Sequence, residues 1–362
     1  MSNAKPNASN ERMKREYLYH LQQAKRQSEA SVDKAAAAID AFLVYTGHRD
    51  LKKFHRRQAT AFKDFLLERQ NERTGGALSL STVQSTLKAM RNFTIWLADQ
   101  PGYKRAVTYT DADYFSLSHG EARAASAPKE KRPPSMADIH KVIGLMPAST
   151  DIERRDRAVV AFTILTGARD GATASFRLKH IDIAGRRLFQ DGREVATKFR
   201  KSFPTFFFPV EGRAEAIVGD WVAHLESRLG FGSDDPLFPR TKVGLDSEGR
   251  LGPLGIDRAP WSNATSIRGI FKKAFAAAGL PYSNPHLFRD ALARLGLDKC
   301  RNHAELKAWS QNLGHEDMLT TLRSYSSISA QEQADLIRGV GDRPAEGDTL
   351  ARIRKLVNEI AA

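Results

Sequence analysis

The chain has almost no cysteine. Its 362 residues include one, Cys300, so no disulfide can form within the chain. A single thiol also excludes the cysteine clusters that hold structural zinc. We expect Cys300 to be a small structural residue of a helix.

Long hydrophobic runs are missing as well. No apolar stretch approaches the roughly 20 residues that a helix needs to cross a bilayer. Residues 1–30 are polar and of mixed charge, without the apolar centre of a signal peptide. From these absences we expect a cytoplasmic protein with no membrane partner.

Acidic residues are too few to balance the basic ones. Lysine and arginine total 56 against 42 aspartates and glutamates, which gives a net charge of +14. Such an excess favours a polyanionic partner, because cationic side chains neutralise phosphates and release counterions. The chain is also long enough for two or three domains, each with its own core.

The pattern of apolar, charged and proline residues divides the chain into five segments. Residues 1–28 resemble a flexible, hydrophilic leader. Residues 29–118 repeat apolar residues at three- and four-residue steps, which predicts a small all-helical domain. Residues 119–134 are small, charged and broken by prolines, as in an interdomain linker. A second domain covers 135–340, and 341–362 form a tail.

In the helical domain we expect three helices, which begin at Ser31, near Thr60 and at Ser81. At the third, Gln84 would complete a capping box with Ser81. Several basic residues punctuate this domain and either contact phosphates or form solvated helix faces. They are Lys52, Lys53, Arg56, Arg57, Lys88 and Arg91.

The second domain is predicted to be mainly α with a small antiparallel sheet, an α+β fold. Ser135 and Asp138 form a capping box at its first helix. Two short strands, at 187–189 and 203–208, flank a basic segment, and Pro204 places the second strand at an edge. Further helices are expected at about 264–278, 285–295, 304–313 and 329–338.

Three short motifs of this domain carry the chemistry. They are Leu165-Thr-Gly-Ala-Arg169, Pro285-His-Leu-Phe-Arg289, and Leu313-Gly-His315 followed by Thr320-Thr321 and Tyr325. Each alone is weak, since the first could end a helix, the second could be two residues on one helix face, and the third could be a helix cap. Their order, with a basic hairpin between the first and second, is far less expected by accident.

Together these residue types suit attack on a phosphodiester. A tyrosine hydroxyl builds negative charge on the non-bridging oxygens, which two arginines can clamp bidentately. Histidine or lysine moves the protons, one of them to the departing 5′ oxygen. A covalent phosphotyrosine preserves the bond energy, so strands rejoin without ATP. This chemistry needs no metal and no cofactor, and the sequence offers no cluster of acidic ligands.

The three motifs resemble the conserved boxes of the tyrosine recombinases, the phage-integrase family. Thr166-Gly-Ala-Arg169 with Leu178-Lys-His-Ile-Asp182 resembles the first-arginine box, and His286–Arg289 resembles the His-x-x-Arg box. The segment from Leu313 to Tyr325 resembles the terminal box. The resemblance covers about 135–340, and the preceding helical domain matches the family's core-binding domain in position and size.

The resemblance implies two kinds of phosphate contact. Arg169 and Arg289 would bind the scissile phosphate, and His315 would donate a hydrogen bond to it. Two positions depart from the family pattern. Ala172 stands where an acidic residue is usual, and Asp290 stands where histidine is common.

The resemblance also implies the nucleophile and the proton carriers. Tyr325 would form the 3′-phosphotyrosyl link, although it lies ten residues past His315, one more than the commonest spacing. His286 would help in proton transfer. Thr197-Lys198-x-x-Lys201 resembles the hairpin of the family's general-acid lysine, so Lys198 is the first candidate and Lys201 the alternative.

The function implied is that of a site-specific DNA recombinase or integrase that works as a homo-tetramer on double-stranded DNA and associates with the nucleoid when bound. One alternative is a DNA-binding accessory protein with a decayed site, which retention of the six polar residues argues against. Another is a monomeric topoisomerase with the same chemistry. The apolar face of 349–360 suits a tail helix exchanged between protomers and favours the recombinase.

Overall fold

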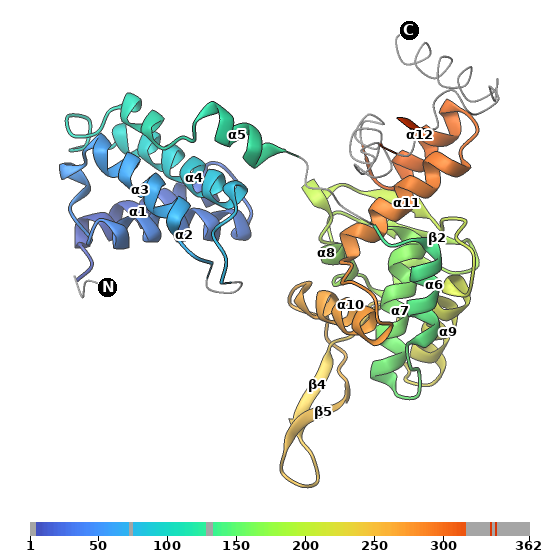
Figure 1. Ribbon diagram of the computed structural model, residues 1–362. Helices are drawn as coiled ribbons and strands as arrows, with labels where there is room; N and C mark the ends of the chain where they lie inside the picture. Colours follow the sequence, from blue (N-terminus) through green and yellow to red (C-terminus); the bar gives the residue numbers. More distant parts are fainter. Residues whose placement is uncertain (1–4, 72–74, 128–132, 316–333, 335–336, 339–362) are drawn as a thin grey trace. The chain divides into compact units, whose positions relative to one another are not determined.

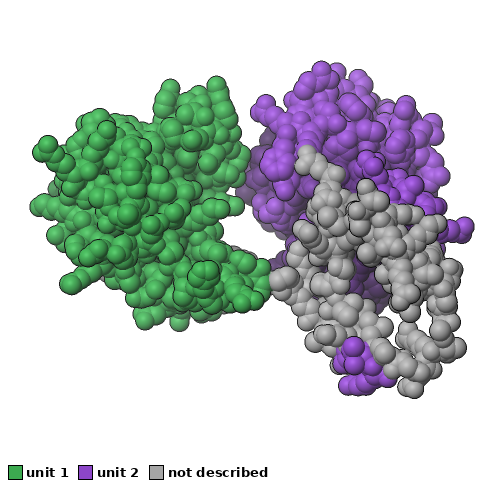
Figure 2. Space-filling model, turned by 90° about the horizontal axis from the view of Figure 1, so that it is seen from above, with its two compact units in different colours: residues 1–129 green, residues 130–362 purple. Residues whose placement is uncertain are grey.

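The computed structural model describes residues 5–71, 75–127, 133–315, 334, 337 and 338. The chain divides into two compact units, residues 1–129 and 130–362, which Figure 2 colours separately. Both units consist mainly of helices, and the strands, all in unit 2, form small antiparallel sheets. This confirms the predicted fold class.

All named elements in the described residues of unit 1 are helices, and an isolated β-bridge joins Gln70 to Ala77. Its helix α4 packs against α1, α2, α3 and α5. Aromatic rings fill its core, where Phe42 meets Phe62 and Phe115 edge to face at centroid distances of 5.2 and 5.4 Å. The elements are α1 (Ala8–Gln23), α2 (Glu29–Tyr45), η1 (Leu51–Lys53), α3 (Arg56–Glu68), α4 (Leu80–Ala98), η2 (Tyr109–Tyr114) and α5 (His119–Ser126).

The predicted flexible leader is wrong for most of its length, because helix α1 belongs to the core of unit 1. Met13, Tyr17 and Leu21 lie at four-residue steps and are buried. Asn10 is also fully buried, and its side chain bonds to the backbone of Arg49 and Leu51 at 2.9 and 3.0 Å. Residues 1–28 resemble a hydrophilic leader in sequence because α1 has only a single row of apolar side chains along one face.

The predicted linker is wrong over α5. This helix begins with a reciprocal capping box between Ser118 and Glu121, and it contacts α4 without burying any side chain. An alanine-rich helix of this kind has good intrinsic propensity but no apolar face for periodicity to detect. Helix α4 also begins earlier than expected, since Ser79 rather than Ser81 caps it.

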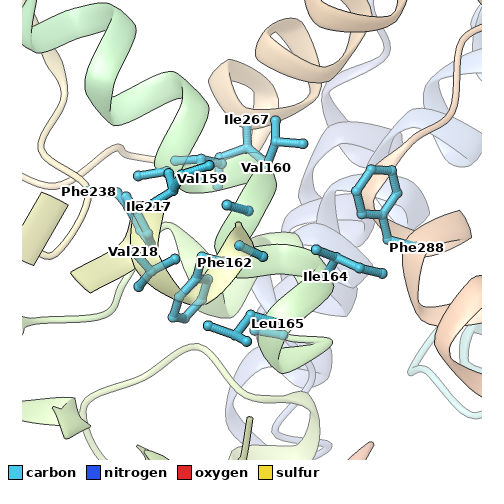
Figure 3. Close-up of a cluster of buried hydrophobic side chains, with 14 of the residues drawn as sticks. Val159, Val160, Phe162, Ile164, Leu165, Ile217, Val218, Phe238, Ile267 and Phe288 are labelled. Carbon is cyan, nitrogen blue, oxygen red and sulfur yellow. The ribbon is translucent and has the colours of Figure 1, made fainter. Parts of the chain in front are cut away.

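Unit 2 packs around helix α7, whose last nine residues, 158–166, are all buried. Figure 3 shows Val159, Val160 and Phe162 of α7 among side chains from other elements. The predicted capping box of Ser135 and Asp138 begins α6. The helices are α6 (Met136–Leu145), α7 (Asp151–Thr166), α8 (Asp170–Thr173), η3 (Leu178–His180), η4 (Lys198–Arg200), α9 (Ala214–Ser227), α10 (Thr265–Ala277), α11 (Pro285–Lys299) and α12 (His303–Asn312).

The main sheet of unit 2 has the order β1-β2-β3, all antiparallel: β1 (Ile181–Asp182), β2 (Arg187–Gln190) and β3 (Phe203–Phe206). Pro204 pairs with Phe189, and β3 is an edge strand as predicted. A second hairpin, β4 (Thr241–Leu245) with β5 (Leu251–Ile256), was not predicted. It extends away from the helices of unit 2 (Figure 1), and its glycine-rich strands lack the alternation of a half-buried sheet.

Candidate active site

Arg289 joins the three predicted motifs. Helix α11 begins after Asn284, whose side chain accepts hydrogen bonds from the backbone of His286 and Leu287 at 2.9 and 3.2 Å. One turn later the Arg289 side chain is buried. Its guanidinium donates to the carbonyl oxygens of Gly167 and, at 2.6 Å, Leu313. One side chain therefore connects the end of α7, helix α11 and the turn after α12.

Gly167 allows this close approach. It caps α7 in the left-handed conformation, with φ of +61°, which glycine adopts without the steric cost of a Cβ. A Cβ here would also lie 2.9 Å from Leu313 Cδ2 and 3.0 Å from Leu292 Cδ1. Glycine at position 167 therefore lets Leu313 of the third motif and Leu292 of α11 pack against the end of α7.

Arg169 follows directly and is half-buried at the start of α8. Its carbonyl oxygen accepts from the backbone N–H of Thr173 at 2.9 Å. The neighbouring Asp170 pairs with Arg268 of α10 at 2.7 Å, so its carboxylate is engaged away from the motifs. Ala172, which stands where the family usually has an acid, is buried in the core.

His315 lies beside Arg289 and within the influence of other basic side chains. Its imidazole Nε2 is 3.4 Å from Arg289 Nη2. Burial, followed by the positive charges of Arg289, Arg169, His286 and Lys198, lowers the pKa of His315 to about 4. The imidazole is therefore neutral at pH 7. These four basic side chains come from three separate parts of the sequence, yet all lie close enough to affect this ring.

His286 and Lys198 lie on the exposed side of this group. The His286 side chain is 58% exposed, and its Nε2 is 3.8 Å from Asp290 Oδ1. Lys198 is exposed in the loop between β2 and β3, with its ammonium 5.0 Å from the centre of the Phe199 ring. Both can therefore meet a ligand from solvent.

The predicted nucleophile, Tyr325, and the Thr320-Thr321 pair before it lie outside the described residues. The same holds for the tail at 341–362 and for most of the helix expected at 329–338. In the part of the chain that is described, no group of three or more histidine, cysteine, aspartate or glutamate residues could hold a metal ion. None of the described helices is both long and apolar enough to cross a membrane.

The six basic residues singled out in unit 1 are all exposed. Three of them have partners on their own unit. Arg91 pairs with Asp113 at 3.0 Å, the Arg56 guanidinium lies 5.7 Å from the Tyr114 ring, and the Lys52 ammonium lies 5.5 Å from the Tyr103 ring. Exposure suits contact with phosphates, and these partners hold the side chains in place on the surface.

Comparison with curated proteins gives relatives of a single kind, although no family model matches the chain. The tyrosine recombinase XerC of Lactobacillus delbrueckii subsp. bulgaricus is 25% identical over 260 residues, which cover 71% of this chain and 76% of the relative. That of Pseudomonas putida is 24% identical over 221 residues, or 60% and 64% of the two chains.

Solved structures show the same fold. A lambda integrase fragment in a dimer bound to a COC′ core site aligns with a TM-score of 0.60 at 13% identity, over 87% of this chain and 94% of the other. The Tn1549 transposon integrase in complex with circular intermediate DNA gives 0.54 at 12% identity, over 91% and 99%. These likenesses show that the chain has the fold of the integrases, and the curated proteins similar to it in sequence are named tyrosine recombinase XerC.

Proposed function

We propose that this chain is a site-specific DNA recombinase that cleaves and rejoins double-stranded DNA through a 3′-phosphotyrosyl intermediate at Tyr325. The observation that carries the proposal is the Arg289 guanidinium, which joins the three motifs and lies 3.4 Å from His315 Nε2. The charges of Arg169, His286 and Lys198 also act on the His315 ring and lower its pKa. Curated relatives named as tyrosine recombinases support it. Neither a silent accessory protein nor a topoisomerase is favoured by them.

In this proposal the two arginines stabilise the negative charge that develops on the scissile phosphate. Arg289 is already oriented by two backbone carbonyls, so little reorganisation is needed when the phosphate arrives. The neutral His315 ring has one N–H with which to bond a phosphate oxygen. The network thus presents fixed donors where the charge appears.

Proton transfer falls to the exposed groups. Lys198 supplies the proton for the departing 5′ oxygen, and His286 assists at the nucleophile side. Lys198 is exposed in the loop between β2 and β3 and is our first candidate for this role, with Lys201 as the alternative. The site needs no metal or ATP, because the cations stabilise the phosphate and the phosphotyrosine retains the bond energy.

We further propose that the protein assembles as a homo-tetramer on DNA, with unit 1 contributing phosphate contacts. A related structure is a lambda integrase tetramer bound to a Holliday junction. In the described part of unit 2, an apolar groove of about 690 Å³ lies between β3 and α12, lined by Phe203, Phe206 and Trp309 among others. We propose this groove as the acceptor for the apolar face of a neighbour's tail.

Trapping of the covalent intermediate tests the proposal. The substrate is a nicked duplex with a randomised core. The nick lets the short product strand dissociate after cleavage, and EDTA is present throughout. Wild-type protein should form an adduct that survives denaturing electrophoresis, and sequencing of the trapped DNA gives the target site. Tyr325→Phe should bind that site and form no adduct. Adducts that persist in Tyr325→Phe, or an absolute need for Mg²⁺, would refute the mechanism.

A further inference from the structure

The loop that carries Lys198 is attached at two points to the segment that follows Arg169. At the first point, Ser175 Oγ accepts a hydrogen bond from the backbone N–H of Ala196 at 2.9 Å. At the second, the Glu194 carboxylate pairs with the Lys179 ammonium at 2.7 Å. Between the two attachments, Val195 is buried in the core of unit 2.

Both attachments are themselves held in place. Ser175 Oγ donates to the carbonyl of Ala172 at 2.9 Å, so its lone pairs face the loop. The Lys179 ammonium also pairs with Asp234 at 2.9 Å, and its backbone N–H bonds to Ser233 at 2.8 Å. The Lys179 ammonium that pairs with Glu194 is therefore held by other contacts as well.

Beyond these attachments the loop adopts a strained turn. Phe199 and Arg200 are successive non-glycine residues with positive φ, +61° and +53°. Such conformations are unfavourable for residues with a side chain and persist only where surrounding contacts enforce them. Thr197 Oγ1 closes the turn by donating to the Lys201 carbonyl at 2.8 Å. Gly192 completes it, since a Cβ there would collide with the Arg200 carbonyl.

We infer that Ser175 and Glu194 are positioning residues, which fix the Lys198 ammonium beside the departing 5′ oxygen. Ser175 lies two residues past α8, the helix that Arg169 begins. The two attachments therefore hold the general acid in register with the phosphate-binding arginine. This inference rests on the proposed function, because it assumes that Lys198 protonates the leaving group.

The reaction step shows how the role can be measured. The Tyr325 hydroxyl gives its proton to His286 as its oxygen forms a bond to phosphorus. The bond from phosphorus to the 5′ oxygen breaks, and Lys198 gives that oxygen a proton; exchange with solvent later restores both side chains. If sulfur replaces the bridging 5′ oxygen, the leaving group is a thiolate, which departs without a proton because thiols are far more acidic than alcohols. A defect confined to proton delivery should vanish with the sulfur substrate.

The experiment measures single-turnover cleavage of matched oxygen and sulfur substrates at the mapped target site. Ser175→Ala and Glu194→Gln should each slow cleavage of the oxygen substrate about 10-fold. The double variant should approach the roughly 10²-fold loss of a missing general acid. All should cleave the sulfur substrate at nearly the wild-type rate. Glu215→Gln is the matched control, because it breaks an ion pair of similar length, 2.9 Å to Arg186, outside the loop.

Lys198→Ala separates failure of the inference from failure of the proposed function. If sulfur restores Lys198→Ala but not the double variant, or if the double variant keeps full activity on oxygen, the positioning role is wrong. If sulfur does not restore Lys198→Ala, the general-acid assignment itself is wrong. If wild-type protein cleaves neither substrate, the proposed function fails.

Discussion

Arg289 and Arg169 have different surroundings, although the same chemistry is proposed for both. Arg289 is buried and donates to two backbone carbonyls from separate motifs. Arg169 is half-buried at the first residue before α8. We therefore expect Arg289 to organise the site as well as to bind the phosphate that is proposed for both arginines.

Substitution by lysine should separate these contributions. Lysine keeps the charge but loses the planar fork, so Arg169→Lys and Arg289→Lys should each slow cleavage by on the order of 10²-fold. Arg289→Lys should also lower the unfolding temperature, because lysine lacks the fork that donates to both buried carbonyls at once. Single-turnover rates and thermal melts measure the two effects. Near-normal cleavage in both variants would mean that the arginines are structural.

His315 gives a prediction on pH. Its pKa of about 4 lies below the ordinary 6.5, so between these values the unfolded chain binds more protons than the folded one. The stability that this residue contributes is full above pH 6.5 and is lost as pH falls through 4. A phosphate at the site should raise the pKa, since its negative charge favours the imidazolium. NMR titration of the ring with and without target DNA measures this, and an unchanged pKa would place the phosphate elsewhere.

At the scale of elements, the sequence predicted those features that a particular residue determines locally. The capping residues of α6, the proline of β3 and the glycine that ends α7 each have a specific backbone consequence. Helices α1 and α5 show little apolar periodicity, because one buries a single row of side chains and the other buries none, and their capping residues were the only local signal. The convergence of the motifs on His315 is a tertiary contact that only the resemblance, and not periodicity, could anticipate.

Helix α1 should contribute substantially to the stability of unit 1. Tyr17 is buried, and its ring lies 5.2 Å from those of both Phe93 and Trp96 on α4. Removal of such a ring leaves a cavity, so Tyr17→Ala should lower the free energy of unfolding by about 3 kcal/mol. Tyr19→Ala on the exposed face of the same helix is the control. Equal, small effects in denaturant titrations would show that α1 is peripheral to the fold.

At the scale of the whole molecule, the net charge and the C-terminal tail concern different partners. The charge concerns DNA, and the tail concerns a neighbouring protomer. The net charge of +14 favours DNA at every step and makes binding depend on salt. It gives no reason for protomers to associate, since like charges repel. Assembly on DNA therefore needs an apolar contact, for which the groove between β3 and α12 offers a described surface.

The tail supplies a matching sequence pattern, with Leu350, Ile353, Val357 and Ile360 at helical spacing. Docking of four such side chains would contribute roughly 1.5–3 kcal/mol each before ordering costs, enough to support a complex on DNA but not a stable oligomer in solution. We therefore expect a monomer without DNA. Deletion of 349–362 should spare single-site binding while weakening the multi-protomer complex and recombination.

Changes to the groove should reproduce the effect of the deletion. Phe206 lines the groove and is 56% exposed, so Phe206→Glu should place a charge in the contact at little cost to folding. Val243→Glu, at a similarly exposed position on β4, is the control. Gel-shift assays with one and two sites distinguish binding from assembly. If the truncated protein recombines two sites at the full-length rate, the tail has no part in assembly. If the deletion weakens assembly on two sites but Phe206→Glu does not, the tail docks on a surface other than this groove.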